Sequence, residues 1–523
     1  MKKISILIIL PLFLLVMLPY TQTRAAVVHE DNTVKQTADL IILTPHWSGI
    51  YNVYVDAFID YWENKTGDTI TIEVLSEDTS ECLRLVEQWD GSPEADVWWG
   101  GGLDAFRIAE SEGLLDSFHN ESDPEWVSIN QSIQDELFGL PLKDLDSEYG
   151  LYNWWGSALS GFGIMYNKPY LEQYGLPEPK DWLDLTNPIY KGHITVVPPS
   201  KSGSNHMIVE IILQAYGWEQ GWDILTKMAA NVRDFQEKSY HVPPLVGEGE
   251  YGIAPVIDFY GFGQIAEKGP DNIGFIYPPA GNGSHTVINP DSVALLKGAP
   301  HPYLAYEFMK FVLSYDGQKL LFEDPINRLP VREDVYDEAP AGYFNPFNTT
   351  LTLMTYNSTL GELRWDIVND LYDILLVNRH AELVSAWNDI LAANATLQDA
   401  AEAGYDISSG EEYLDKALEE LTKVPITEDW IEENYEEYAD NETLREEYHS
   451  EWDVFAVDKY RNASDYAWLA STTVTEFIIS HLSGVAQQNL WLGLGGGFTL
   501  GLIIGVAGVV LFYRRKWAAA AAE

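Results

Sequence analysis

The stretch at residues 95–106 reads Ala-Asp-Val-Trp-Trp-Gly-Gly-Gly-Leu-Asp-Ala-Phe. The apolar run predicts a strand at residues 95–99, the three glycines predict a short loop, and a helix is expected to begin at Asp104. Residues 193–204 repeat this construction, with an apolar run, then Pro-Pro-Ser-Lys-Ser-Gly-Ser, then a helical pattern. The chain therefore contains two strand–loop–helix units of the same kind.

Both loops are candidates for ligand contact. In open α/β sheets ligands bind outside the carboxyl ends of the strands, and unpaired N–H groups at a helix start bind oxyanions. Two such loops, in separate strand–helix series, suggest two lobes that face one ligand across a cleft. The alternative is that each loop is an ordinary tight turn, and neither matches a nucleotide-binding glycine motif.

Outward from these units, short apolar runs alternate with helical patterns, which is typical of an α/β fold with largely parallel sheets. A helix begins near Ile50 and ends at Gly67, because its apolar residues recur on one helical face. Beyond residue 361 the pattern is helical and rich in glutamate. Strands are predicted at residues 39–44, 69–75, 163–166, 251–257 and 273–277, and further helices at 207–216, 218–231 and 301–313.

Two further strand ends carry polar or aromatic side chains. His46, in the run after the first strand, is a candidate ligand contact or a helix cap, and Trp47 beside it could stack on a ring. Asp258 could accept a hydrogen bond from a cation, and Tyr260 could stack or donate one. The alternatives are a cap for Asp258 and a core aromatic for Tyr260.

Composition excludes several classes of protein. The 523 residues include 31 Lys and Arg against 80 Asp and Glu, a formal net charge of −49, so nucleic-acid binding is disfavoured. This acidity is interpreted as a solvated surface, with steering of a cationic ligand as the alternative. Cys82 is the only cysteine, which excludes an intrachain disulfide and a thiolate zinc site. The sequence contains neither H-E-x-x-H nor G-x-S-x-G, so no catalytic residue, metal site or cofactor is predicted.

The two ends predict the location of the chain. Residues 1–26 have the charged start, apolar run and small residues of a secretory signal. Residues 490–512 contain no charge and are long enough to span a membrane as a helix, and the basic residues that follow place the tail, 513–523, in the cytoplasm. The expected location is the cell membrane, single-pass, with a large extracellular domain. Nine Asn-x-Ser/Thr sequons lie in the segment assigned to the outside.

An ordered series of motifs resembles the extracellular solute-binding proteins of ABC importers. It includes Gly-Ile-Met-Tyr-Asn-Lys at 163–168, Pro-Lys-Asp-Trp-Leu-Asp-Leu at 179–185 and Leu-Pro-Val-Arg at 329–332, besides the two loops. The branch that it resembles takes ferric iron, thiamine and its phosphates, phosphonates or polyamines. The resemblance implies an α/β, two-lobed periplasmic-binding-protein fold (type II-like) that closes on a ligand by a hinge and delivers it to a permease.

Carried over to this chain, the resemblance implies a first lobe from residues 38–135 and 285–390, and a second from 136–284. The remainder, 391–488, is expected to be an acidic helical stalk or small bundle. The residues expected at the cleft are Thr44, His46, Trp47, Gly101, Gly102, Ser202, Gly203, Ser204, Asp258 and Tyr260.

The resulting hypothesis is a membrane-anchored solute-binding protein, not an enzyme, with an ABC permease as its partner. Thiamine phosphate or another organic phosphate or phosphonate is favoured over ferric iron or a polyamine, because Phe259 stands where iron-binding relatives carry a second tyrosine. Two alternatives stay open, a membrane-tethered hydrolase and a cell-surface adhesion protein.

Overall fold

The computed structural model describes residues 38–116, 123–146, 151–280, 283–349 and 353–491. The predicted signal, residues 1–26, and the tail, 513–523, lie outside these ranges, as does the predicted membrane segment from residue 492 onward. Within the described ranges, none of the helices combines the length and the apolar character needed to cross a membrane. The single-pass anchor therefore stays a prediction.

The first lobe is built on a sheet that contains the strand of the opening motif. Three of its strands, β1, β2 and β3, are parallel, and β14 runs antiparallel to β3. The helix predicted from Ile50 is α1, which buries one apolar face and ends at Gly67 in the left-handed conformation. The strand order is β2 (Ile72–Ser76), β1 (Leu40–Thr44), β3 (Val97–Gly102), β14 (Ile288–Leu295), β7 (Leu151–Asn167) and β6 (Lys143–Asp146), and the helices are α1 (Ser48–Thr66), α2 (Thr79–Trp89), α3 (Leu103–Ser111), α4 (Pro124–Ser132), α10 (Pro302–Leu313) and α11 (Tyr315–Lys319).

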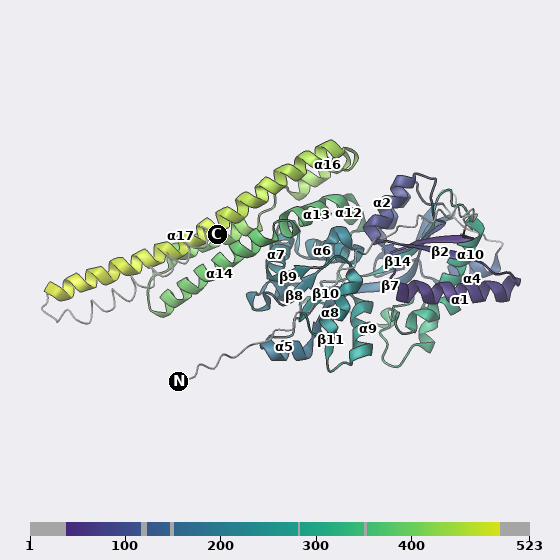
Figure 1. Cartoon of the computed structure of the whole chain (residues 1–523), viewed down its shortest axis with the longest axis horizontal. Helices are drawn as coiled ribbons and strands as arrows, with labels where there is room; N and C mark the ends of the chain where they lie inside the picture. The colour runs from purple at the N-terminus through teal and green to yellow at the C-terminus, as the bar shows by residue number, and fades with distance from the viewer. Residues whose placement is uncertain (1–37, 117–122, 147–150, 281–282, 350–352, 492–523) are drawn as a thin grey trace, which may run out of the picture. The chain divides into compact units, whose positions relative to one another are not determined.

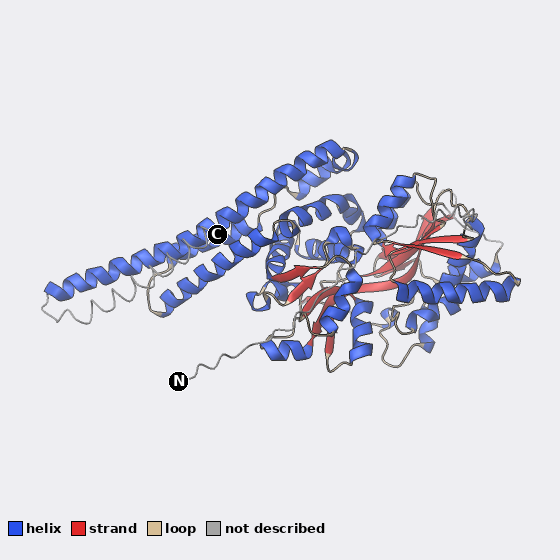
Figure 2. Ribbon diagram, viewed as in Figure 1, coloured by secondary structure: helices blue, strands red, loops and turns tan. Residues whose placement is uncertain are grey.

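The second lobe continues the same sheet on the far half of β7. There β7 pairs antiparallel with β10 and β11, while β8 runs parallel to β10 and β9. Figure 2 shows the strands of the two lobes as separate groups joined by long strands. The elements are β8 (Ile194–Val196), β9 (Val232–Phe235), β10 (Ile253–Ile257), β11 (Ile273–Ile276), α5 (Lys168–Tyr174), α6 (Gly203–Tyr216), α7 (Trp218–Asn231), α8 (Val242–Gly247) and α9 (Asp258–Lys268).

The passage between the lobes lies inside β7. This strand has 17 residues; Trp155 to Gly161 pair with β14, and Phe162 to Tyr166 pair with β10. Strand β6, at residues 143–146, pairs with the first half of β7 and so belongs to the first lobe. The chain therefore passes from the first lobe to the second near residue 161, within β7, whereas the sequence predicted this boundary at residue 136.

The residues after 353 form helices that pack against both one another and the lobes. The long α17 packs on α14 and α15, and both of these also contact α7 of the second lobe. Helices α14 to α17 thus form a helical bundle that contacts α7 of the second lobe (Figure 1). The helices are α12 (Ser358–Leu363), α13 (Trp365–Tyr372), α14 (His380–Glu402), α15 (Ser408–Thr422), α16 (Glu428–Asp440) and α17 (Glu442–Trp491).

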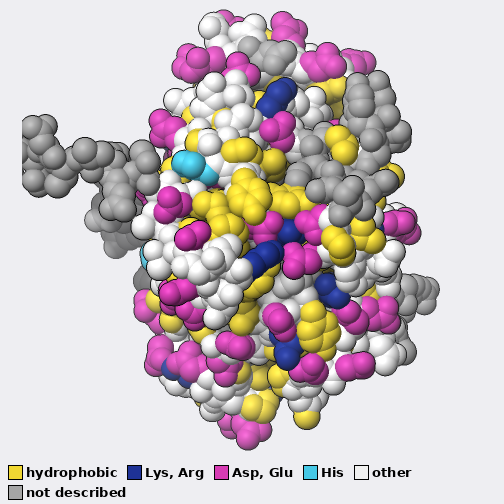
Figure 3. All heavy atoms as spheres, turned by 90° about the vertical axis from the view of Figure 1, so that its right-hand side faces the viewer, with side chains coloured by type: hydrophobic (Ala, Val, Ile, Leu, Met, Phe, Trp, Pro, Cys, Tyr) yellow, Lys and Arg dark blue, Asp and Glu magenta, His cyan; other side chains and the backbone are white. Residues whose placement is uncertain are grey.

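The charge imbalance is visible on the surface. Figure 3 shows acidic side chains scattered over one face of the molecule, with far fewer basic ones among them. The interior is aromatic instead: Trp98, Trp99, Trp154 and Trp155 are all buried in the core. None of these four tryptophans lines the pocket described below, whereas Trp47, the residue predicted to stack on a ring, does.

Candidate functional site

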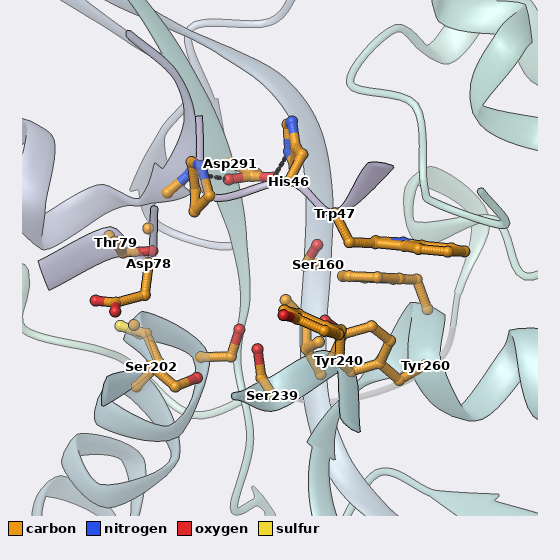
Figure 4. Close-up of a pocket in the computed structure, with 18 of the residues that line it drawn as sticks. His46, Trp47, Asp78, Thr79, Ser160, Ser202, Ser239, Tyr240, Tyr260 and Asp291 are labelled. Atoms are coloured by element: carbon orange, nitrogen blue, oxygen red, sulfur yellow. Dashed lines mark hydrogen bonds and ion pairs between the residues drawn. The ribbon is translucent and has the colours of Figure 1, made fainter. Parts of the chain in front are cut away.

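A pocket lies between the two lobes, at the ends of β1 and β3 and at the starts of α2, α6 and α9. Both strand–loop–helix units predicted from the sequence contribute to it. Eight of the ten predicted residues line it: His46, Trp47, Gly101, Gly102, Ser202, Gly203, Ser204 and Tyr260. Figure 4 shows Trp47, Tyr240 and Tyr260 on one side of this pocket, with Asp78, Thr79 and Ser202 on the other.

One end of the pocket is the start of α6. Ser202 is the N-cap, and its hydroxyl accepts a hydrogen bond of 3.3 Å from the backbone N–H of Asn205. Because the first N–H groups of a helix have no carbonyl one turn before them, the start of this 14-residue helix presents donors and a partial positive charge to the pocket. Lys201 and Lys238 flank it; Lys201 pairs with Glu237, and Lys238 lies 3.3 Å from Asp78 of the opposite lobe.

The floor of the pocket is a buried ionic cluster. Asp291, on β14, accepts a hydrogen bond from the Gly101 backbone and pairs with the Arg328 guanidinium. Burial alone would raise the pKa of Asp291, but the charge of Arg328 and the hydrogen bond from the Gly101 backbone N–H outweigh it and hold that pKa below its usual range. The carboxylate therefore stays ionised and compensates the buried arginine.

His46 belongs to the same cluster. Burial lowers its pKa, so the ring is neutral at physiological pH. Its Nε2 lies 2.7 Å from Arg328 Nη1 and 3.1 Å from Asp291 Oδ2. Because the guanidinium can only donate, Nε2 is the acceptor of that bond and the ring proton sits on Nδ1.

The three glycines of the opening motif do not form a loop; they end strand β3. Gly100 and Gly101 have φ angles of 103° and 122°, which other residues rarely adopt. A Cβ at Gly100 would lie 2.7 Å from the His46 ring, so the glycine makes room for the histidine. The expectation of a glycine loop is wrong, because these residues shape the ionic cluster as part of the sheet.

Several buried donors around this cluster have no hydrogen-bond partner among the described residues. They are Nδ2 of Asn289, Nε of Arg328 and Nδ1 of His46, on side chains that are 2 %, 2 % and 6 % exposed. All three residues line the pocket. Because an unsatisfied buried donor is costly, these three donors are available for hydrogen bonds to a water molecule or a solute in the pocket.

One wall of the pocket is aromatic. Phe259 packs against Tyr260, with ring centroids 4.4 Å apart, and the Arg328 guanidinium lies 4.7 Å from the Phe259 ring centre. Tyr240 and Trp47 complete the wall. Burial raises the pKa of Tyr260 to about 12, which disfavours its phenolate form.

The remaining two predicted residues are buried beside the pocket and hold its walls. The Thr44 hydroxyl donates to the carbonyl of Trp99 at 2.5 Å and accepts from the His46 backbone at 3.1 Å. The Asp258 carboxylate accepts hydrogen bonds from the Gly161 backbone at 2.6 Å and from the Tyr277 hydroxyl at 2.8 Å. Both side chains are therefore held by hydrogen bonds within the protein.

Comparisons with known proteins agree with this architecture. Residues 122–350 match a family described as bacterial extracellular solute-binding protein. Phosphoglycerate transport regulatory protein PgtC of Salmonella typhimurium is 29 % identical over 316 residues, which cover 58 % of this chain and 71 % of that protein. These likenesses, with the two-lobed fold, support a solute-binding protein of the ABC-importer type.

Two solved structures share the fold of this chain. The periplasmic binding protein AfuA from Actinobacillus pleuropneumoniae, with fructose-6-phosphate bound, superposes with a TM-score of 0.54 at 20 % identity, covering 64 % of this chain and 98 % of that one. Iron-bound HitA from Pseudomonas aeruginosa gives 0.50 at 21 % identity, covering 63 % and 97 %. A small-molecule ligand, a permease partner and an extracellular or periplasmic location fit this type of protein, and so does the expectation that the chain is not an enzyme.

Sequence reasoning missed the polar residues that the pocket draws from strand β14 and from the loop before residue 329. Asn289 and Asp291 lie on β14, whose mixed Asn-Pro-Asp-Ser sequence lacks the apolar character of a typical strand. Arg328 immediately precedes the Leu-Pro-Val-Arg motif at 329–332, which was the available signal for it. Thr79 and Lys238 lie in polar stretches without a recognisable motif, so nothing in the sequence marked them as pocket residues.

Proposed function

We propose that the chain captures a small organic phosphate between its lobes and delivers it to an ABC permease. The observation that carries this proposal is the start of α6, which faces a pocket whose buried donors on Asn289 and Arg328 have no acceptor among the residues that the structure describes. A phosphate supplies several acceptor oxygens and a negative charge, which suit both features.

The names of similar proteins agree with this choice. PgtC is named for phosphoglycerate transport, and AfuA was solved with fructose-6-phosphate. The aromatic wall would then contact the uncharged part of the solute. None of the relatives reported above is named for thiamine, so thiamine phosphate is one test compound among several.

Ferric iron is the weaker candidate, although HitA was solved with iron. Phe259 offers no lone pair, the Tyr260 phenol resists ionisation, and the Nε2 atom of His46 is already held by Arg328. Among the residues that the structure describes, no group of three or more His, Cys, Asp and Glu side chains is placed to hold a metal ion.

The test is a ligand panel on the purified full-length chain. Thermal shift and calorimetric titration would compare 3-phosphoglycerate, fructose 6-phosphate, thiamine phosphate, inorganic phosphate, spermidine and ferric citrate. A solute present at 100 times its Kd stabilises the folded state by about 2.7 kcal/mol, which the thermal shift resolves. We expect an organic phosphate to give the largest shift; binding of spermidine or ferric citrate alone would refute the proposal, and turnover of a chromogenic ester would favour the hydrolase alternative.

We further propose that residues 490–512 tether the protein to the cell membrane, with the lobes outside. A tether would keep the binding protein at high local concentration near its permease. Fractionation of cells that express the full chain tests this: the protein should stay with the membrane after a carbonate wash. Deletion of residues 490–523 should release it, and recovery of the full chain in the wash would contradict the tether.

A further inference from the structure

The segment at residues 356–369, here called the strap, contacts both lobes on one side of the pocket. It includes α12 and the first part of α13, and in Figure 1 it lies beside α2 and α6. It joins the end of the lobe-forming part of the chain to the C-terminal helical bundle. Its side chains therefore occupy the position where the bundle can act on the lobes.

On the first lobe the strap contacts α3. The Tyr356 hydroxyl donates to the buried carboxylate of Asp104, and Arg107 Nε lies 3.2 Å from Glu362 Oε2. The contact is close, because a Cβ at Gly361 would lie 2.5 Å from Asp104 Oδ2.

On the second lobe the strap contacts α6, the helix whose start forms one end of the pocket. Arg364 Nε lies 2.9 Å from Glu210 Oε1, and both side chains are buried. Trp365 stacks on His206 with ring centroids 3.8 Å apart, and the His206 ring bonds Asn369 at 2.8 Å.

The strap also reaches the pocket and the bundle. Tyr356 contacts the sulfur of Met207, at 3.6 Å, and Met207 lines the pocket. At the other end, Arg364 Nη1 lies 2.8 Å from Glu428 of α16. One connected set of side chains thus runs from the bundle through the strap to the pocket.

We propose that the strap holds the two lobes together on this side, so that the C-terminal bundle sets how far the cleft opens and how tightly solute is retained. The ion pairs that hold the strap on the two lobes differ in strength. The buried Arg364–Glu210 pair is costly to separate, whereas the Arg107–Glu362 pair is partly exposed and cheap to break. Opening therefore breaks the Arg107–Glu362 pair more readily than the Arg364–Glu210 pair, and it must also break the buried Tyr356–Asp104 hydrogen bond for the strap to leave α3.

The test measures the distance between the lobes in the full-length chain without any solute. Cysteines placed at Glu63 of α1 and Glu172 of α5, both exposed, would carry spin labels, while Cys82 is fully buried and stays unlabelled. Gly361→Leu inserts a side chain between the strap and α3. Gly263→Leu is the matched control, since this helical glycine has open space around it.

We expect Gly361→Leu to shift the spin–spin distances to longer and broader values, and Gly263→Leu to leave them unchanged. Arg107→Glu should do the same as Gly361→Leu through charge repulsion, and adding Glu362→Arg should restore the parent distances. Arg107 and Glu362 are partly exposed, so this pair keeps the test decisive if Gly361→Leu fails to fold. Parent-like distances in the folded strap variants, including Arg107→Glu, would overturn the proposal.

A second measurement rests on the proposed function. If the binding-competent closed state falls to a tenth of the population, the apparent Kd for fructose 6-phosphate rises about tenfold. Absence of binding in the parent would count against the proposed solute, while the label distances would still decide the role of the strap.

Discussion

The substitution Gly203→Ala distinguishes two explanations for the presence of a glycine at the start of α6. From the sequence, this glycine lets the backbone approach a ligand. In the structure a Cβ at Gly203 would lie 2.7 Å from the Cβ and Oγ1 atoms of Thr79, the first residue of α2 in the opposite lobe. The glycine is therefore needed for the two lobes to meet.

The size of the effect follows from that overlap. Forcing one methyl group into a close-packed contact costs about 1–3 kcal/mol. The lobes can avoid the overlap by staying apart, so this cost falls on closure and leaves the folding of each lobe intact. Affinity for fructose 6-phosphate should then fall roughly 5- to 150-fold, while the urea midpoint of the full-length chain should hardly change.

Calorimetric titration of Gly203→Ala and of the double variant Gly203→Ala/Thr79→Gly is the decisive comparison. Removing the Thr79 side chain clears the space, so the double variant should regain most of the affinity. Gly263→Ala, in the open surroundings noted above, is the control. If Gly203→Ala binds as the parent does, or if Thr79→Gly rescues nothing, the lobe-contact explanation is refuted.

Three further outcomes follow from single sites. Trp47 is the tryptophan of the pocket, so solute binding should quench tryptophan emission, and Trp47→Phe should abolish most of that change in a fluorescence titration. Burial lowers the pKa of Lys459, in α17, to about 7, so between pH 7 and 10.5 the unfolded chain binds more protons there than the folded one. Urea unfolding should show stability rising by up to about 1.4 kcal/mol per pH unit in that range, and Lys459→Met should remove this contribution. Arg364→Ala leaves the Glu210 carboxylate buried without its partner and should cost about 3–5 kcal/mol in urea unfolding, whereas Arg364→Met/Glu210→Leu should cost much less.

The regular elements could be predicted because their local pattern and their tertiary burial agree. The helix at residues 218–231 appears with the predicted bounds, as α7, and α1 ends at Gly67 as its sequence requires. The two strand–loop–helix units could also be assigned to one pocket, because the carboxyl ends of strands in the two lobes face the same cleft. Local chemistry was enough for these elements.

Most of strands β7 and β14 could not be predicted, for a physical reason; only residues 163–166 of β7 were predicted as a strand. Gly156, Gly161 and Gly163 interrupt the apolar pattern of β7, because neighbouring side chains and backbone occupy the space where a Cβ would be. Asn289 and Asp291 interrupt β14, because that strand lines the pocket and holds polar groups there. Residues at the connection between the lobes thus depart from the apolar pattern of an ordinary strand.

The acidity of the chain and a phosphate ligand are compatible once distance is considered. A net charge of −49 repels a long polyanion over its whole length, but at physiological ionic strength charges more than about 8 Å apart are largely screened. Within the pocket Arg328 is matched by Asp291, and Lys238 by Asp78, so the local charge is close to balanced. Selection of an anion there depends on directional N–H donors and on the positive end of α6, whose partial charge is about half an electron unit. The composition therefore disfavours nucleic-acid binding but not the binding of a small phosphate, because a long polyanion meets the charge of the whole surface and a small phosphate meets only the pocket.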